Sequence, residues 1–410
     1  MATMKNRRME IWLALIVMPV ALVLIAIPGL FVYMSATATP LHPNPQDVPS
    51  VTRSSSLPQW AGAVGQGREI MRVALTGQNL PGLSVAVGVG GEIVWAEGFG
   101  WADLEKRVPV SPEMRFRIGT ASTVLTSAAA GLLLERGRLK LDEQIQTYVP
   151  EFPEKQWPVT LRQLMAHVSG VVNDGGDEGP LLSQHCERPI EAWQHLSGNE
   201  LRLLFEPETQ YHYSSYGWIL VSAAVEAAAR EPFLTFMQKE IFDPSGMDDT
   251  RAESAAEPIP DRATFYFPRF AADPRYGPEL MRPIDLSCYA GSSAFLSTPS
   301  DLVRFGIAIN SGTLLQPATV QLLQTSQRLA SGLETGYGLG WDLETVALAG
   351  QQTRVIGHDG DSLGGKVASL MTLPAHGVVV SVTSNISYAD TFAVAAKIAE
   401  AFATQGRPYD

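Results

Sequence analysis

The stretch Thr123–Leu134 restricts how this chain can fold more than any other segment. Its sequence, TVLTSAAAGLLL, is small and apolar all around a helix rather than on one side of it. A helix of this kind is stable only when other elements cover it on every side. The chain has 410 residues, of which 45% are hydrophobic, so it can build the large core that such a helix needs.

Runs of β-forming residues lie towards both ends of the chain. Leu83–Val89 and Ile93–Glu97 are separated by Gly90-Gly91-Glu92, which predicts a hairpin. Further strands are expected near the C-terminus, at Leu339–Thr345, Arg354–Ile356, Val367–Leu373 and Val378–Thr383. Helices are predicted at Leu161–Met165, Gly217–Ala229, Pro299–Ile309 and Thr391–Ala403.

This order of elements predicts an α+β fold with two lobes. One antiparallel sheet would be built from N- and C-terminal segments and flanked by helices, with a helical lobe inserted between them. The stretch Val171–Ser197 begins with several Gly and Asp residues and is expected to be a long surface loop at the rim of a cleft.

The N-terminus carries an apolar segment, Ile11–Tyr33, which contains no charged residue and is long enough to cross a bilayer. Lys5, Arg7 and Arg8 precede it, which favours a cytoplasmic N-terminus and an exported remainder. We therefore expect a transmembrane anchor at residues 11–34 after a cytoplasmic stretch at 1–10. A cleaved signal peptide is the alternative, since Ala36-Thr37-Ala38 has the small residues of a cleavage site.

Residues 35–58 are rich in Pro and Ser and are predicted to form a semi-rigid spacer. The folded domain is then expected at residues 59–410, on the periplasmic or extracellular side. The N-terminal helix would hold the protein in the membrane.

Composition excludes some classes of partner and cofactor. The formal net charge is −12 without a Lys/Arg block, which argues against nucleic-acid binding. The seven histidines show no metal-binding spacing, so neither a metal site nor another cofactor is expected. Cys186 and Cys288 leave two readings open, a disulfide in an oxidising compartment or two buried thiols.

Many short segments occur in the order seen in one known family. The chain resembles the serine beta-lactamase-related family, which includes class C beta-lactamases, DD-peptidases and related esterases, over about residues 75–400. The segments that carry the resemblance are Pro81-Gly82, Gly98–Leu104, Met114–Gly119, Gly137–Asp142, Tyr148–Phe152, Leu161–Gly170, Tyr211–Gly217, Ala290-Gly291-Ser292, Phe295–Thr298 and Tyr337–Trp341. The resemblance implies the two-lobed fold of the family and acyl transfer through a serine ester without a cofactor.

The first motif of the family, Ser-x-x-Lys, places the nucleophile and its base one helical turn apart. In this chain the four positions are Thr120-Ala121-Ser122-Thr123. The resemblance therefore puts Thr120 and Thr123 at the catalytic positions. Ser122 is a poor substitute, because two residues correspond to about 200° around a helix.

The second motif, Tyr-x-Asn, corresponds to Tyr213-Ser214-Ser215, and the third to His358-Asp359-Gly360 followed by Asp361. The resemblance implies catalytic positions at Tyr213 and His358. The implied substrate-binding residues are Ser215, Asp359, Gly360 and Asp361. A carboxylate at position 359, where relatives have a hydroxyl, is expected to repel the carboxylate of a beta-lactam or a D-alanyl terminus.

Each of these residues also has an interpretation without catalysis. Thr120 and Thr123 are suitable helix-capping residues. Tyr213 is then a packed aromatic residue, and His358 a polar residue at a strand end. His167 is a structural hydrogen-bonding residue, and Lys366 a solvated loop lysine.

Two functions are compatible with these patterns. In the first, the domain is a catalytically degenerate family member, whose cleft binds a small-molecule or peptide-like ligand, or a protein partner, without forming an acyl-enzyme. In the second, it is an active hydrolase of esters or peptides, with Thr120 as nucleophile and Tyr213 or His358 as base.

Overall fold

The computed structural model of the chain describes residues 24, 26–53, 58–173, 179–198, 202–253, 259–348 and 350–405. Residues 1–23 and 25, which include most of the anchor predicted at 11–34, lie outside these ranges. Residues 26–37 are helical. Among the described residues, none of the helices combines the length and the apolar character needed to span a bilayer.

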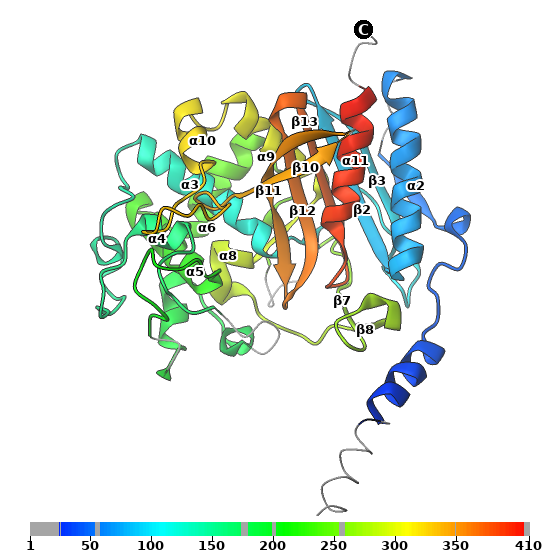
Figure 1. Cartoon of the computed structure of the whole chain (residues 1–410), viewed down its shortest axis with the longest axis horizontal. Helices are drawn as coiled ribbons and strands as arrows, with labels where there is room; N and C mark the ends of the chain where they lie inside the picture. Colours follow the sequence, from blue (N-terminus) through cyan, green and yellow to red (C-terminus); the bar gives the residue numbers. More distant parts are fainter. Residues whose placement is uncertain are drawn as a thin grey trace, which may run out of the picture.

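The centre of the fold is an antiparallel sheet that joins the two ends of the chain (Figure 1). Its strand order is β1-β3-β2-β13-β12-β11-β10. The N- and C-terminal parts meet where β2 pairs with β13, from Leu83 opposite Ser384 to Val89 opposite Val378. The predicted sheet is therefore confirmed, and its strands are β1 (Ser50–Thr52), β2 (Gly82–Val89), β3 (Glu92–Asp103), β10 (Asp342–Leu348), β11 (Gln351–Ser362), β12 (Gly365–Leu373) and β13 (Val378–Ser384).

Helices cover both faces of the sheet. Helices α2 (Ala61–Gln78) and α11 (Thr391–Gln405) pack side by side on one face, where they close a core with β2, β12 and β13. Helix α9 (Pro299–Ser311) packs on the opposite face, against β2 and β13. The larger core lies on that side and continues into the helical lobe.

Helix α3 (Ser122–Glu135) runs through the helical lobe, and its predicted burial is confirmed. Helices α5 (Ser215–Ala229), α8 (Ala290–Ser293) and α10 (Pro317–Leu323) surround it. Its buried hydroxyls bond to main-chain carbonyls, as when Ser122 donates to Gly119 O at 2.7 Å. Such local bonds satisfy polar groups that have no access to water.

Shorter elements connect these layers. The strands are β4 (Val108–Pro109), β5 (Phe116–Arg117), β6 (Arg251–Ala252), β7 (Tyr266–Pro268), β8 (Pro278–Leu280) and β9 (Phe295–Ser297). The helical segments include η3 (Gly119–Ala121), α4 (Leu161–Met165), η6 (Pro180–Ser183), η7 (Pro189–Gln194), α6 (Phe233–Met237) and α7 (Asp243–Ser245).

The expected spacer is not a free linker in its described part. Strand β1 pairs with β3, and the ring of His42 is buried where its Nε2 lies 3.1 Å from Pro81 O. Val48 belongs to the core beneath α2 and α11. The prolines of this segment are compatible with a short edge strand, because only a few of its main-chain groups need to pair.

The expected loop at 171–197 is also more ordered than its composition indicates. It contains the turns η6 and η7, and buries Leu181, Ala192 and Trp193 in the large core. Residues 174–178 lie outside the described ranges.

Candidate active site

The site forms where the end of β11 extends beyond its neighbour. Strand β10 pairs with β11 only as far as Gly357, so His358–Ser362 have a free edge on that side. The turn η3 lies directly against this edge. Glycines make the close approach possible, because a Cβ on Gly360 would lie 1.9 Å from Ile118 O and one on Gly119 would lie 2.1 Å from Asp361 O.

The Thr120 hydroxyl bonds to the main chain of this strand edge. It donates to Asp359 O at 3.2 Å and accepts from the N–H of Asp361 at 2.9 Å. No side chain caps the N-terminus of α3, so Thr120 does not have the capping role that was expected. Its hydroxyl instead links the helical lobe to the sheet. The proton of this hydroxyl therefore points to a carbonyl oxygen, which is not a base of useful strength.

Thr123, one turn later, is completely buried. Its hydroxyl donates to Thr120 O at 2.8 Å, within its own helical turn. The position that the resemblance assigns to the family's lysine is thus occupied by a short neutral group.

Tyr213 lines the pocket together with Thr120 of η3. Its phenol oxygen is buried and makes no hydrogen bond to the described residues that satisfies normal geometry. Burial raises the pKa of Tyr213 well above its ordinary value, and the nearby Thr120 hydroxyl opposes this only in part. A phenol with so high a pKa stays protonated at neutral pH and is a weak proton acceptor.

His167 holds the segment that carries Tyr213. Its Nδ1 accepts the N–H of Ser214 at 3.0 Å, and its ring centroid lies 4.1 Å from that of Tyr213. Burial lowers the pKa of His167 well below its ordinary value, so the ring is neutral. This geometry agrees with the structural interpretation of His167.

His358 is hydrogen-bonded to Tyr337 and to the main chain of Asp359 rather than to Thr120. Its Nε2 lies 3.0 Å from the Tyr337 hydroxyl, and its Nδ1 contacts Asp359 O. Because a carbonyl can only accept, the proton is assigned to Nδ1, and Nε2 accepts from the tyrosine. Neither nitrogen is hydrogen-bonded to the Thr120 hydroxyl.

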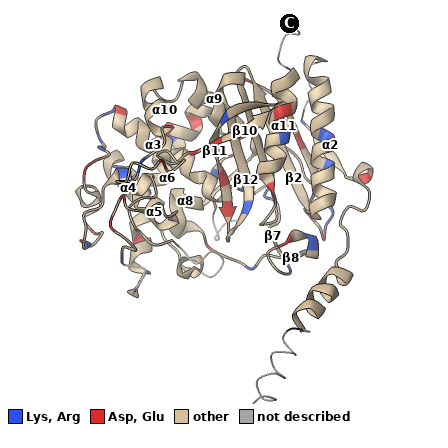
Figure 2. Cartoon of the chain, in the orientation of Figure 1, with Lys and Arg blue, Asp and Glu red and all other residues tan. Residues whose placement is uncertain are grey.

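A β-bulge between Gly360 and Asp361 separates two carboxylates that simple alternation would place on one face. Asp359 accepts from the Ser369 hydroxyl at 2.5 Å and pairs with Lys366 Nζ at 2.5 Å, whereas Asp361 lines the pocket beside Thr120. In Figure 2 the acidic positions lie at the end of β11 and a basic one on neighbouring β12. Asp359 was expected to present its carboxylate to the substrate, but the carboxylate that lines the pocket is that of Asp361. Lys366 is the ion-pair partner of Asp359 rather than a solvated loop lysine.

The pocket itself is small, with a volume of about 140 Å³. It brings together four of the expected residues, Thr120, Tyr213, Ser215 and Asp361, while Thr123, His358, Asp359 and Gly360 do not line it. The rest of its lining is Asn173, Leu182, Leu286, Tyr289, Ser293, Ser362, Leu363 and Gly364. A larger cavity of about 810 Å³ lies between α9, α10 and the sheet and contains none of the motif residues.

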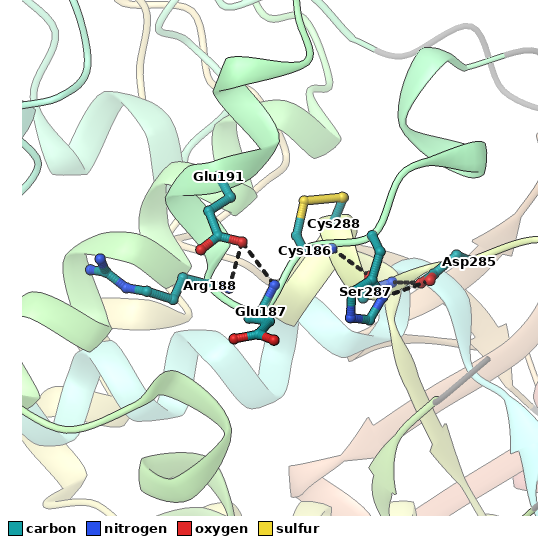
Figure 3. Close-up of a disulfide and its surroundings, with 8 residues drawn as sticks. Cys186, Glu187, Arg188, Glu191, Asp285, Ser287 and Cys288 are labelled. Carbon is teal, nitrogen blue, oxygen red and sulfur yellow. Dashed lines mark hydrogen bonds and ion pairs between the residues drawn. A yellow bond between two sulfur atoms is a disulfide. The ribbon is translucent and has the colours of Figure 1, made fainter. Parts of the chain in front are cut away.

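A disulfide ties the two segments that form the apolar side of this pocket. Cys186 and Cys288 are bonded to each other, and this settles the pairing that their number alone left open (Figure 3). Asp285 and Ser287 add hydrogen bonds between the same segments, including one of 2.9 Å from the N–H of Cys186 to Ser287 Oγ. His195 has a ring nitrogen within 4.8 Å of both sulfurs, but sulfurs bonded to each other offer no thiolate to a metal.

Motif reasoning missed several of these residues. Tyr337 belongs to a recognisable segment, yet its bond to His358 depends on a strand register that no local pattern defines. Asn173 accepts the N–H of Ser215 at 2.8 Å from a loop with no motif of its own. The apolar wall residues are ordinary leucines in the sequence, and carry no signal of their role.

Comparisons with known proteins agree with this fold. The family model described as Beta-lactamase matches residues 68–405. The bovine serine beta-lactamase-like protein LACTB, mitochondrial, from Bos taurus, is 27% identical over 84% of this chain and 80% of its own length. The structure of an octameric penicillin-binding protein homologue from Pyrococcus abyssi aligns with a TM-score of 0.66 at 22% identity, over 81% of this chain and 75% of the other. That of EstCE1, a hydrolase with promiscuous acyltransferase activity, aligns with a TM-score of 0.66 at 20% identity, over 83% of this chain and 98% of the other.

Proposed function

Because the chain belongs to the beta-lactamase family, a family of serine hydrolases, we propose that it retains the family's cleft as a ligand-binding pocket and forms no acyl-enzyme. The observation that carries this proposal is the bonding of Thr120. Its hydroxyl proton is donated to the main-chain oxygen of Asp359, and its lone pairs receive the N–H of Asp361. A hydroxyl becomes a nucleophile only when a base removes its proton, and this proton faces none.

The electrostatics of the pocket support the same proposal. None of the described lining residues is a lysine, arginine or histidine. The pKa of Tyr213 is raised by burial, and no lysine at position 123 is present to lower it. Loss of one member of such a catalytic unit reduces rates by about 10³–10⁶-fold.

The pocket is also unsuited to the anionic substrates of penicillin-recognising enzymes. Asp361 adds a negative charge next to Thr120, and like charges brought together cost several kcal/mol. The ligand proposed here is therefore a small molecule or one end of a peptide-like molecule without a carboxylate at this point. A protein partner that inserts such a group is the other form of the same proposal.

We place the domain outside the cytoplasm, held by the apolar N-terminal segment. The Cys186–Cys288 disulfide supports an oxidising compartment, because such bonds are rare where thiols are kept reduced. Lys5, Arg7 and Arg8 before the apolar segment support this orientation.

An active hydrolase is the second candidate, and one observation favours it. The N–H of Asp361 lies 2.9 Å from the Thr120 hydroxyl oxygen, and a donor in this place would stabilise negative charge that develops there. The missing component is the base, since the nitrogens of His358 are bonded elsewhere.

Turnover of p-nitrophenyl acetate and of a chromogenic cephalosporin separates the two candidates. The wild-type protein and its Thr120→Ala variant should give the same rates, both close to the buffer background. Clear wild-type turnover that is lost in Thr120→Ala would instead establish a threonine-dependent hydrolase.

A further inference from the structure

Asp361 is the one charged side chain among the described residues that line the pocket. No described residue pairs with its carboxylate within ion-pair or hydrogen-bond distance. The nearest cross-strand cation, Lys366, is bound to Asp359 at 2.5 Å instead. The bulge before Asp361 thus places an uncompensated negative charge at the pocket, on a residue that is also exposed to solvent.

Around this carboxylate the pocket presents hydroxyl groups. Hydroxyl oxygens accept hydrogen bonds, and the phenol oxygen of Tyr213 is buried with the Thr120 hydroxyl close to it. A phenol oxygen can accept a further hydrogen bond from a ligand. The side chains concerned are those of Thr120, Tyr213, Ser215, Ser293 and Ser362.

Part of the pocket lining is apolar. Leu182, Leu286 and Leu363 contribute it, and the disulfide joins the segments that carry the first two. A dry cavity of about 150 Å³ can hold a benzene molecule. The pocket, at about 140 Å³, therefore has room for a group of about five to eight non-hydrogen atoms.

We propose that this pocket binds a compact primary amine, with the ammonium group against Asp361, hydrogen-bonded to the surrounding hydroxyls, and its short carbon chain against the leucines. The inference rests on the proposed function, because it treats the bound molecule as a ligand that is held and not acylated. A carboxylate would be repelled by Asp361, and a neutral group of the same shape would leave the charge of Asp361 without a counter-ion.

The electrostatic state of Asp361 is consistent with a missing counter-ion. Desolvation, together with the nearby charges of Asp359 and Asp342, raises the pKa of Asp361, while His358 and Lys366 lower it in part. A bound cation reverses this balance, since an opposite charge at close range favours the ionised carboxylate.

A head-group series tests the proposal directly. The full-length protein in mild detergent is titrated calorimetrically with n-butylammonium, 1-butanol and butyrate, which share one carbon chain and differ in charge. We expect saturable binding of n-butylammonium and none of butyrate, with 1-butanol at least several-fold weaker than the amine. Equal binding of all three, or preference for butyrate, would overturn the assignment.

Two variants identify the residue responsible. Asp361→Asn keeps the size of the side chain and removes its charge, and should weaken n-butylammonium binding roughly fivefold or more. Glu344→Gln removes one negative charge from neighbouring β10, outside the pocket, and should leave binding unchanged. Equal loss in both variants would mean that the amine responds only to the overall charge, and no loss in Asp361→Asn would mean that it binds elsewhere.

The head-group result is independent of the test for catalysis. If ester turnover through Thr120 were found, the proposed function would fail, yet the same three compounds could still be ranked on the unreactive Thr120→Ala variant. If no turnover were found and the amine failed to bind, only the ligand class would be wrong.

Discussion

The main-chain N–H of Asp361 donates a hydrogen bond of 2.9 Å to the hydroxyl of Thr120, although the two residues are 241 positions apart in the chain. This bond joins the first turn before α3 to the free edge of β11, and therefore links the two lobes at the pocket. It also engages the hydroxyl that the resemblance assigns to the family's nucleophile position. The same contact thus supports the pocket structurally and leaves Thr120 without a base.

Close contact between η3 and β11 depends on Gly119, which has φ of +53° and faces the main chain of Asp361. We expect Gly119→Ala to lower the free energy of unfolding by at least about 2 kcal/mol, because the new methyl group meets backbone and the conformation is strained. Gly137→Ala is the matched control. Gly137 also has a positive φ, +65°, but has nothing within 4 Å of its added methyl, so its cost should be about 1 kcal/mol. Urea denaturation measures both, and equal losses would contradict the packing argument.

The disulfide closes a long loop, with 102 positions between Cys186 and Cys288. Replacing both cysteines with alanine should lower the free energy of unfolding by roughly 2–4 kcal/mol, mainly through the greater freedom of the unfolded chain. Reductant should have the same effect on the wild type and none on the double variant. Two thiols titrating in the denatured wild-type protein before reduction, with a denaturation midpoint that reductant does not change, would contradict this prediction.

Asp361 should reduce the stability of the ligand-free protein at neutral pH. Its pKa is raised chiefly by desolvation, so the folded state holds the proton more tightly than the unfolded state. Stability contributed by the protonated form is then lost as the pH rises above the ordinary Asp value of about 3.9. We expect Asp361→Asn to have a higher Tm than the wild type at pH 7, with the difference disappearing below about pH 4.

Asp142 provides the opposite case for the same measurement. The Arg162 side chain lowers the pKa of Asp142, so Asp142→Asn should slightly lower the Tm at pH 7. A lower Tm for Asp361→Asn at pH 7 would show that the Asp361 carboxylate has a stabilising partner in the wild-type protein. The claim that this carboxylate lacks a counter-ion in the ligand-free pocket would then be wrong.

The N-terminal segment should keep the protein in the membrane. After expression, the domain should stay in the membrane fraction through a high-salt wash, which removes proteins held only by charge. It should also be digested by protease added outside the cytoplasm. Release as a soluble protein with a new N-terminus near Thr39 would identify a cleaved signal peptide instead.

Local sequence patterns were sufficient for the buried helix α3 and for the β2–β3 hairpin, since each follows from a composition or a period within one segment. The orientation of Asp361 could not be predicted, because a one-residue bulge reverses the face expected from alternation. The bond between Tyr337 and His358 and the pairing of Cys186 with Cys288 depend on long-range folding that two short segments do not encode. Strand β1 was missed because the prolines that precede it indicate an extended spacer, and only β3 provides its pairing partner.

The central claim, that Thr120 cannot be acylated for want of a base, is tested most directly by intact-mass spectrometry after treatment with a fluorophosphonate probe. The wild type and Thr120→Ser should gain no adduct, because serine without a nearby base is also a weak nucleophile. The double variant Thr120→Ser with Thr123→Lys should gain one adduct on residue 120 and some ester cleavage, since Tyr213 and the N–H of Asp361 remain in place. An adduct on Thr120 of the wild-type protein, absent from Thr120→Ala, would contradict the account.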